Sequence, residues 1–275
     1  MKPWQSVVRY CAIALALVLI ISIASCGFKI VGISLGLASV GTYDEARVYS
    51  FNAEGIDDLE IDIASARFTL ESTNGDKITV KTNIKSFTAK EIGSALKLKE
   101  KTGFINADTT DAFVEVFFPI GFEFDTVDID AGAGKLTIID LTAKKLDADL
   151  GAGDTGFVDL TVTDRADIDG GVGNLSFSRS VITDLDLDLG VGYFNFHGIL
   201  NGNNDISFGV GESVVDFYDD KERYYFDVEK GIGEIEYYGP EDFNFVRDGQ
   251  DTTVKLEGGI GKITIRFFDK IDNEG

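Results

Sequence analysis

The sequence predicts an all-β repeat protein that follows an N-terminal membrane segment. Three observations predict it: a Gly-x-Gly pair recurs about every 20 residues, apolar and acidic residues alternate before each pair, and an uncharged apolar run lies near the N-terminus. They divide the 275 residues into three parts. Residues 1–43 hold a cytoplasmic N-terminus, a transmembrane anchor and a juxtamembrane segment, 44–126 hold irregular β rungs or a cap, and 127–275 hold the regular repeats.

The membrane segment begins with an 18-residue run without a charge, Cys11 to Phe28, which is just long enough to cross hydrocarbon as a helix. Lys2 and Arg9 precede it, so the positive-inside rule places the N-terminus in the cytoplasm and the β domain outside. A second apolar stretch follows, and residues 11–40 together are the predicted membrane contact. We therefore expect a single-pass membrane protein.

Two alternatives to an uncleaved anchor stay open. The run also fits a cleaved signal peptide, and Ile23-Ala24-Ser25-Cys26-Gly27 fits a lipobox in which Cys26 would carry a lipid. All three interpretations put the β domain outside the cytoplasm. Cys11 and Cys26 are the only cysteines, so the exterior part has neither a disulfide framework nor a thiolate metal site.

Seven Gly-x-Gly pairs define the repeat, and their middle residue is always Ala, Val or Ile. Their first glycines are separated by 19, 20, 19, 19, 22 and 28 residues. The pairs begin at Gly132, Gly151, Gly171, Gly190, Gly209, Gly231 and Gly259. A spacing this regular predicts one structural unit per pair.

Each unit reads as strand, glycine corner, strand and polar turn. Apolar residues stand three and five positions before the first glycine, as Ile129 and Val127 do, and again four and six positions after it, as Leu136 and Ile138 do. This period of two is typical of half-buried strands. The parity changes at the corner, where glycine takes up one residue with a positive φ. We expect polar turns at positions such as 142–145 and 163–165.

The region before the regular repeats carries a weaker version of the pattern. Leu59, Ile61 and Ile63 alternate with acidic residues, and Ala64-Ser65-Ala66 stands where Gly-x-Gly would be. The segments up to Gly132 predict degenerate rungs or an elaborated cap, which is usual for the terminal units of repeat proteins.

The segment Phe113-Val114-Glu115-Val116-Phe117-Phe118-Pro119, followed by the Asp-x-Gly-x-Gly strand repeats, resembles the bacterial putative-adhesin family of β-strand-repeat proteins of unknown function. The resemblance covers about residues 44–270. It implies a right-handed parallel β-solenoid in the cell envelope, commonly with an N-terminal anchor. It offers no site residues to carry over.

Two columns of acidic residues are the chemical feature of the repeats. They lie four and two positions before the first glycine, and parallel stacking in register would place neighbours about 4.8 Å apart. The first column is Asp128, Asp147, Asp167, Asp186, Asp205 and Asp227, and the second is Asp130, Asp149, Asp169, Asp188, Ser207, Glu229 and Glu257. Carboxylates this close repel each other by about 1 kcal/mol in water, so bound cations or basic neighbours should offset the repulsion.

A calcium-binding face is one interpretation of these columns, since Ca²⁺ prefers oxygen ligands. Its candidate residues are Asp128, Asp130, Asp147, Asp149, Asp167, Asp169, Asp186 and Asp188. The other interpretation, which we prefer, is a solvated acidic face that keeps a long sheet soluble and blocks aggregation. No other cofactor is expected.

Net charge limits the partners. Residues 1–43 carry three basic and no acidic side chains, so the rest of the chain holds 22 basic and 47 acidic ones. Such a surface repels nucleic acid and anionic lipid. An envelope polymer or a protein is the expected partner.

Several motif matches have structural explanations. Gly151–Gly156 spells a dinucleotide-binding loop, but another strand follows it in place of the required helix. His197 is the only histidine, and its place after a strand residue predicts a structural role. Outward tyrosines such as Tyr218 or Tyr238 are candidates for a glycan or protein patch, although core and cap packing is preferred.

We therefore predict a non-enzymatic binding, adhesin-like or scaffold module. The alternative is a membrane-coupled accessory or sensor protein in envelope-stress signalling. In it the anchor would transmit the signal, and the activity would depend on Ca²⁺. A glycan-degrading enzyme would need carboxylates converging at one irregular place, whereas these recur with the repeat.

Overall fold

The computed structural model describes residues 42–100, 111–229, 231–238 and 251–268, all of which belong to one compact unit. They form a single hydrogen-bonded network of 17 strands with one short 3₁₀ turn, so the described chain is all-β. The predicted membrane segment, residues 11–40, lies outside the described residues. Within the described ranges, no helix is long and apolar enough to cross a membrane.

The strands follow one another along the chain with short connections. They are β1 (Thr42–Asn52), β2 (Asp58–Ile63), β3 (Arg67–Thr73), β4 (Lys77–Ile84), β5 (Phe87–Ile92), β6 (Ala95–Glu100), β7 (Phe113–Pro119), β8 (Glu123–Ile139), β9 (Thr142–Val158), β10 (Thr161–Thr183), β11 (Leu185–Asn201), β12 (Asn203–Ser207), β13 (Val210–Phe217), β14 (Tyr224–Glu229), β15 (Ile232–Tyr238), β16 (Thr252–Glu257) and β17 (Ile260–Phe267), with the 3₁₀ turn η1 (Lys221–Arg223) before β14.

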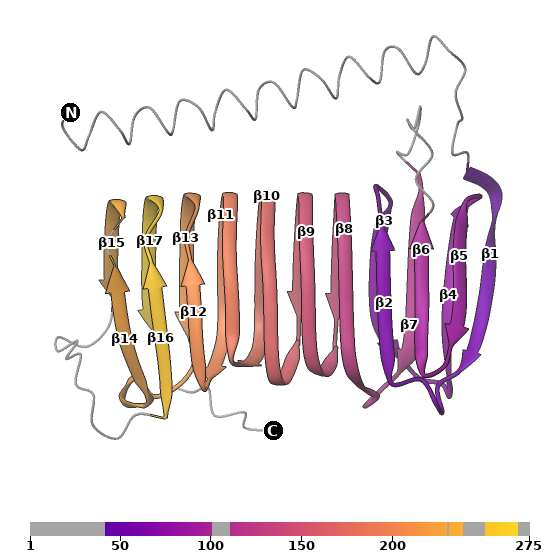
Figure 1. Cartoon of the computed structure of the whole chain (residues 1–275), viewed down its shortest axis with the longest axis horizontal. Helices are drawn as coiled ribbons and strands as arrows, with labels where there is room; N and C mark the ends of the chain where they lie inside the picture. The colour runs from indigo at the N-terminus through magenta and orange to yellow at the C-terminus, as the bar shows by residue number, and fades with distance from the viewer. Residues whose placement is uncertain (1–41, 101–110, 230, 239–250, 269–275) are drawn as a thin grey trace, which may run out of the picture. The chain divides into compact units, whose positions relative to one another are not determined.

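The regular centre of the fold consists of β8 to β11, each a long strand that bends at its glycine pair (Figure 1). These strands pair in parallel, and equivalent positions of successive repeats are partners. Gly134 pairs with Gly153, Gly153 with Gly173, and Gly173 with Gly192. The parallel stacking in register that the repeat spacing predicts is therefore confirmed. We call each strand–corner–strand unit a rung.

The core lies between the two halves of the rungs. In β8 and β11, alternate residues before and after the corner are buried, as the period of two predicts. Rings from the two halves meet inside: the centroids of Phe208 and Phe194 are 6.3 Å apart, and those of Phe217 and Phe226 are 5.7 Å apart. Burial of such a side chain stabilises the fold by about 1.5–3 kcal/mol.

The glycine corners have the conformation that the change of parity predicts. The second glycine of each pair has a φ of 137° to 152°, a region open essentially to glycine alone. The stack also needs hydrogen atoms at these positions. A Cβ on Gly153 would lie 1.8 Å from the carbonyl oxygen of Gly134, and one on Gly151 would lie 1.9 Å from that of Gly132. Both glycine columns therefore permit close approach of successive rungs.

The turns between rungs are displaced from the predicted positions. Residues 142–145 and 163–165 belong to β9 and β10. The chain reverses instead at Asp140, Asp159 and Asp184, whose φ values are 58°, 55° and 49°. Aspartate tolerates this left-handed conformation better than most side chains do, and the tight turns leave the following polar residues free to enter the next strand.

The N-terminal part, β1 to β7, covers one end of the parallel stack. β2 and β3 form an irregular rung that pairs with β8, and its Ala64–Ala66 corner stands in the place of a glycine pair. The buried Glu100 carboxylate accepts hydrogen bonds from the Ala64 and Ser65 amides, at 2.9 and 3.1 Å. Farther out, β1 pairs with β4, β4 with β7 and β5 with β6 in antiparallel fashion, which ends the parallel arrangement.

The C-terminal rungs do not follow sequence order. β16 and β17 pair with β12 and β13 on one side and with β14 and β15 on the other, so the last repeat lies between its two predecessors (Figure 1). The sequence-based ladder placed Asp227 directly after Asp205, and this order is wrong. Lys255 lies between them.

Candidate functional site: the acidic ladders and the apolar corner column

Two acidic ladders run along the outer side of the first half of the rungs. The distal ladder, four positions before the first glycine, consists of Glu60, Asp128, Asp147, Asp167, Asp186, Asp205, Lys255 and Asp227. The corner ladder, two positions before it, consists of Asp62, Asp130, Asp149, Asp169, Asp188, Ser207, Glu257 and Glu229. The eight candidate aspartates are thus brought together in register, and all are exposed.

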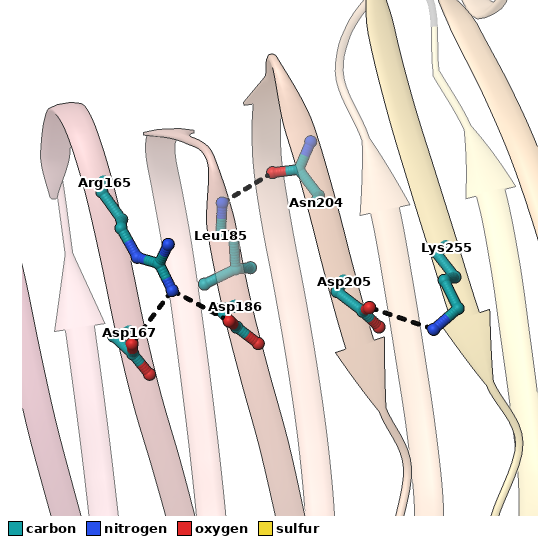
Figure 2. Close-up of polar contacts among 7 residues, drawn as sticks. All are labelled: Arg165, Asp167, Leu185, Asp186, Asn204, Asp205 and Lys255. Carbon is teal, nitrogen blue, oxygen red and sulfur yellow. Dashed lines mark hydrogen bonds and ion pairs between the residues drawn. The ribbon is translucent and has the colours of Figure 1, made fainter.

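Basic side chains offset the repulsion along the distal ladder. Figure 2 shows Arg165 between Asp167 and Asp186, with a guanidinium nitrogen 3.1 and 2.9 Å from their carboxylates. The Lys255 ammonium lies 3.1 Å from the Asp205 carboxylate and also contacts Glu257. These hydrogen bonds raise the pKa of Lys255. The basic neighbours that the sequence predicts as an offset to carboxylate repulsion are therefore present along the distal ladder.

At the β2 end of both ladders, basic side chains also neutralise the carboxylates. Lys97 pairs with Glu60 at 2.6 Å, and Lys99 pairs with Asp62. Between the ends, within the described part of the chain, a group of aspartates has no ion pair: Asp128, Asp130, Asp147, Asp149, Asp169 and Asp188. Four of these six belong to the corner ladder, so its centre is the most anionic surface that the rungs present.

Loss of hydration within the ladders, and then the charge of neighbouring carboxylates, raise the pKa values of Asp128, Asp147 and Asp169 above the ordinary 3.8. Loss of hydration and like-charge repulsion therefore both oppose the charged form of these groups in the folded state.

The calcium interpretation gains no discrete site from this arrangement. In residues 42–100, 111–229, 231–238 and 251–268, no three His, Cys, Asp or Glu side chains gather so that they could hold a metal ion. The ladder spacing of a parallel sheet keeps carboxylates in rows, whereas Ca²⁺ needs six to eight oxygens around one point. A Ca²⁺-dependent face therefore stays a prediction.

An apolar column runs along the corner beside the corner ladder. It consists of the middle residues of the glycine pairs, which pair rung to rung in the order Ala133, Ala152, Val172, Val191, Val210, Ile260 and Ile232. All are exposed, and the valines and isoleucines keep 39% to 56% of their surface accessible. We call these seven side chains the apolar corner column.

A shallow hollow lies between the corner ladder and the apolar corner column. Asp130, Asp149 and Asp169 line it together with the glycine backbone of the first corners. Ala131 and Leu150 line it as well, and the glycines leave the rest of its floor without side chains, so polar groups of a partner can approach the backbone and the carboxylates together.

The other residues singled out in the sequence lie elsewhere. His197 is on the outer side of β11, where its Nδ1 lies 3.4 Å from the Asp216 carboxylate. Asp216 is buried and accepts two hydrogen bonds from the Arg266 guanidinium, at 2.6 and 2.7 Å. Tyr218 stacks between His197 and Phe268. These contacts join three rungs, and the Arg266 guanidinium balances the charge of the buried Asp216 carboxylate, which supports the structural role predicted for His197.

Residues Gly151–Gly156 run through the corner of β9 into its second half and precede no helix, as expected. Tyr238 is exposed and donates a hydrogen bond to Glu236 at 2.7 Å.

Neither the apolar corner column nor the position of Lys255 was predicted from the sequence. The signal for the column was present: a residue flanked by two glycines at the apex of a corner has no core to face. No local signal places Lys255 between Asp205 and Asp227, because that depends on which rungs become neighbours.

The chain is similar to several solved structures from bacteria. A putative adhesin from Bacteroides fragilis NCTC 9343 has 10% identity and a TM-score of 0.41, over 82% of this chain and 98% of that chain. A putative adhesin from Parabacteroides distasonis ATCC 8503 has 13% identity and a TM-score of 0.40, over 84% and 100%. A putative cell adhesion protein from Clostridium sporogenes ATCC 15579 has 13% identity and a TM-score of 0.35, over 82% and 99%.

No family model matches the sequence, and no curated protein matches it. Since the TM-scores lie below 0.5, the function proposed below rests on the residues of this chain.

Proposed function

We propose that this protein is a non-enzymatic cell-envelope protein that presents its acidic β domain outside the cytoplasm as a binding or scaffold module. The observation that carries the proposal is the pair of acidic ladders running beside an exposed apolar column over successive rungs. Every column repeats at about 4.8 Å. A surface with one repeat in all its columns suits an elongated partner, such as an envelope polymer or an extended protein segment.

The interior supports binding at the outer surface. The space beneath the corners amounts to about 80 Å³ and is spread over many rungs, from Ile63 to Ile263. Ligand pockets usually enclose about 300–1,000 Å³. Large rings such as Phe177 and Phe194 fill the space between the two halves, so a ligand of ordinary size has the outer faces as its contact surface.

The proposal includes the finer architecture that the sequence predicts, a right-handed β-solenoid. It is supported by the nearly constant shift of 18 to 20 residues between paired positions from β8 to β11. A chain that returns to the same register after each repeat coils about one axis. Residues 11–40 would tether this coil to the membrane, with the N-terminus inside.

Topology and membrane retention test the location. A reporter that is active only outside the cytoplasm, fused after residue 275, should be active in the full chain. Activity of a cytoplasmic reporter at that position would overturn the proposed orientation. Loss of membrane retention in Cys26→Ala would assign the anchor to lipidation in place of a transmembrane helix.

Capture from membranes tests the function. The affinity-tagged full chain, solubilised from its native membranes, should retain an envelope polymer or protein. A version with residues 1–43 replaced by an unrelated anchor should retain it equally, since binding belongs to the β domain. Failure of both versions to capture any component would contradict the proposal. If the version with the unrelated anchor captures the partner as before but loses a stress-response phenotype, the membrane-coupled sensor would be favoured.

A further inference from the structure

We propose that the apolar corner column and the corner ladder together bind a cationic amphipathic α-helix of a partner protein. The inference rests on the proposed function and names the partner's chemistry. Seven exposed apolar side chains in an unbroken line are unusual on a soluble surface, where large apolar groups are mostly scattered singly. Here they follow from the repeat itself, since each corner contributes one.

The charge of the partner follows from the side of the column on which the carboxylates lie. Asp130, Asp149, Asp169 and Asp188 form an unpaired run directly beside it. On the other side, three positions after the first glycine, acidic, basic and neutral residues are mixed, and no two acidic residues are neighbours. That side carries Lys135, Asp154, Asn174, Tyr193, Glu212, Lys262 and Glu234. A partner with Lys or Arg along one border of its apolar stripe would match this asymmetry.

The hollow lined by Asp130, Asp149 and Asp169 gives the basic groups a place to bind. Most of its floor is glycine backbone, with Ala131 and Leu150 as the apolar side chains that line it, so an ammonium or guanidinium group has room to reach two carboxylates at once. Arg165 already bridges two aspartates of the distal ladder in this way.

The helical form of the partner follows from the backbone of the corners. Their amide and carbonyl groups already pair between rungs, as in the 2.8 Å bonds from Ile260 N to Gly209 O and from Ile232 N to Gly259 O. An added strand would therefore find no free backbone partners along the column. A helix satisfies its own backbone. Six intervals of about 4.8 Å give the column a length of about 29 Å, which matches a helix of about 19 residues.

The direction of the helix is set by two gradients. The column grows from alanine through valine to isoleucine toward the β14–β15 end. The run of four unpaired carboxylates lies beside its alanine and valine part, whereas beyond Asp188 the corner ladder continues with Ser207, with Glu257, which Lys255 contacts, and with Glu229. The partner should therefore be most basic at one end and most apolar at the other. A second copy of this chain fits poorly, because its net charge is −22.

Binding of designed peptides tests the inference. The full chain in nanodiscs of zwitterionic lipid is titrated into a fluorescent 18-residue Leu/Lys amphipathic peptide, with empty nanodiscs as the blank. A Lys/Ser peptide of equal charge is the comparison. We expect the Leu/Lys peptide to bind at least tenfold more tightly, and both affinities to fall as NaCl rises from 50 to 500 mM. Equal affinity for both peptides would reduce the interaction to charge alone and overturn the proposal.

Matched variants locate the contact. Val172→Thr/Val191→Thr/Val210→Thr should weaken Leu/Lys binding at least fivefold, and Asp149→Asn/Asp169→Asn should do the same. The control Val48→Thr/Ile92→Thr/Ile120→Thr changes three apolar side chains of similar exposure, 56% to 63%, outside the column, and should bind as the wild type does. Equal effects of the control and column variants would refute the assignment.

Two further results separate this inference from the proposed function. The first is dimerisation of the wild type that is lost in the column variant, Val172→Thr/Val191→Thr/Val210→Thr. This result would make the column an interface between two copies of the chain and would overturn the helix proposal. Capture of the native partner by the column variant at wild-type yield would also overturn it, while leaving the proposed binding function intact.

Discussion

Replacing Gly153 by alanine should destabilise the fold severely, because this glycine serves two purposes at once. Its φ of 146° is strained for any residue with a Cβ, at a cost of about 1–3 kcal/mol. The new Cβ would also lie 1.8 Å from the Gly134 carbonyl oxygen. Backbone must move aside, since Cβ atoms do not approach other heavy atoms closer than 3.0 Å. The required displacement is therefore at least 1.2 Å, the difference between these two distances.

A shift of that size disrupts the ladder on the affected side of the corner. Loss of about two backbone hydrogen bonds would cost about 1 kcal/mol each. Together with the backbone strain, the expected loss in the free energy of unfolding is about 3–5 kcal/mol, a large part of the 5–15 kcal/mol of a typical domain. For a β unit of this size, the melting temperature should fall by roughly 10 °C or more.

The matched control is Gly156→Ala in the same strand. Gly156 has no positive φ, and a Cβ there would meet only the Ser176 hydroxyl, at 3.4 Å. Its replacement should be neutral or stabilise by up to about 1 kcal/mol, because alanine has less freedom in the unfolded chain. Urea unfolding of the full chain, followed by circular dichroism in the strand region, compares the two. A difference below 1 kcal/mol between them would refute the account of the glycine corner.

Four other predictions concern the ladders and the C-terminal rungs. Lys255→Met should lower the melting temperature and Lys255→Glu should lower it further, with both effects reduced in 500 mM NaCl. The exposed control Lys90→Met should melt as the wild type does. Equal melting of all three variants would contradict the role of Lys255. The raised pKa values of Asp147 and Asp169 mean that these carboxylates bind protons more tightly in the folded state than in the unfolded chain. The stability that proton binding contributes therefore grows as pH falls from neutral toward 4, and it is lost as pH rises through the raised pKa. Asp147→Asn/Asp169→Asn should therefore raise stability at pH 7 by less than about 1 kcal/mol per carboxylate and flatten the pH dependence; an unchanged pH profile would count against the repulsion. Asn204→Ala should cost about 2–4 kcal/mol in urea unfolding, since the buried amide accepts from Leu185 N at 3.0 Å and donates to Thr253 O at 3.1 Å, while Asn203→Ala serves as the exposed neighbour and a similar loss there would refute the bridging role. Millimolar CaCl₂ should raise the melting temperature no more than MgCl₂ at equal ionic strength, and a rise specific to Ca²⁺ would establish a discrete calcium site.

The order of the C-terminal rungs has an electrostatic reason that the Lys255 variants probe. The inserted repeat carries three outward basic residues, Lys255, Lys262 and Arg266, and each faces an acidic residue of a flanking rung. Lys262 pairs with Glu236 at 2.8 Å, and Arg266 covers the buried Asp216. In sequence order, Asp205 would face Asp227 and Glu212 would face Glu234. The insertion therefore replaces like-charge neighbours by ion pairs.

Local sequence patterns predict the strands, their inward faces and the register of the central repeats. These follow from local chemistry: a period of two buries alternate residues such as Ile129, and a glycine pair such as Gly151–Gly153 fixes where each strand bends. The two acidic columns could be predicted for the same reason, because equal spacing from a corner puts residues in line once the rungs stack in parallel.

Contacts between distant parts of the chain determine which rungs are neighbours and what faces solvent at the corners. The repeats beginning at Gly231 and Gly259 have the same pattern, so either could follow the repeat at Gly209, and contacts between residues about 50 positions apart, such as Lys255 with Asp205, choose between them. Likewise, the turns at Asp140 and Asp159 and the exposure of Val172 depend on how the rungs close against one another. Local sequence sets what each rung is, whereas long-range charge and packing set where it lies.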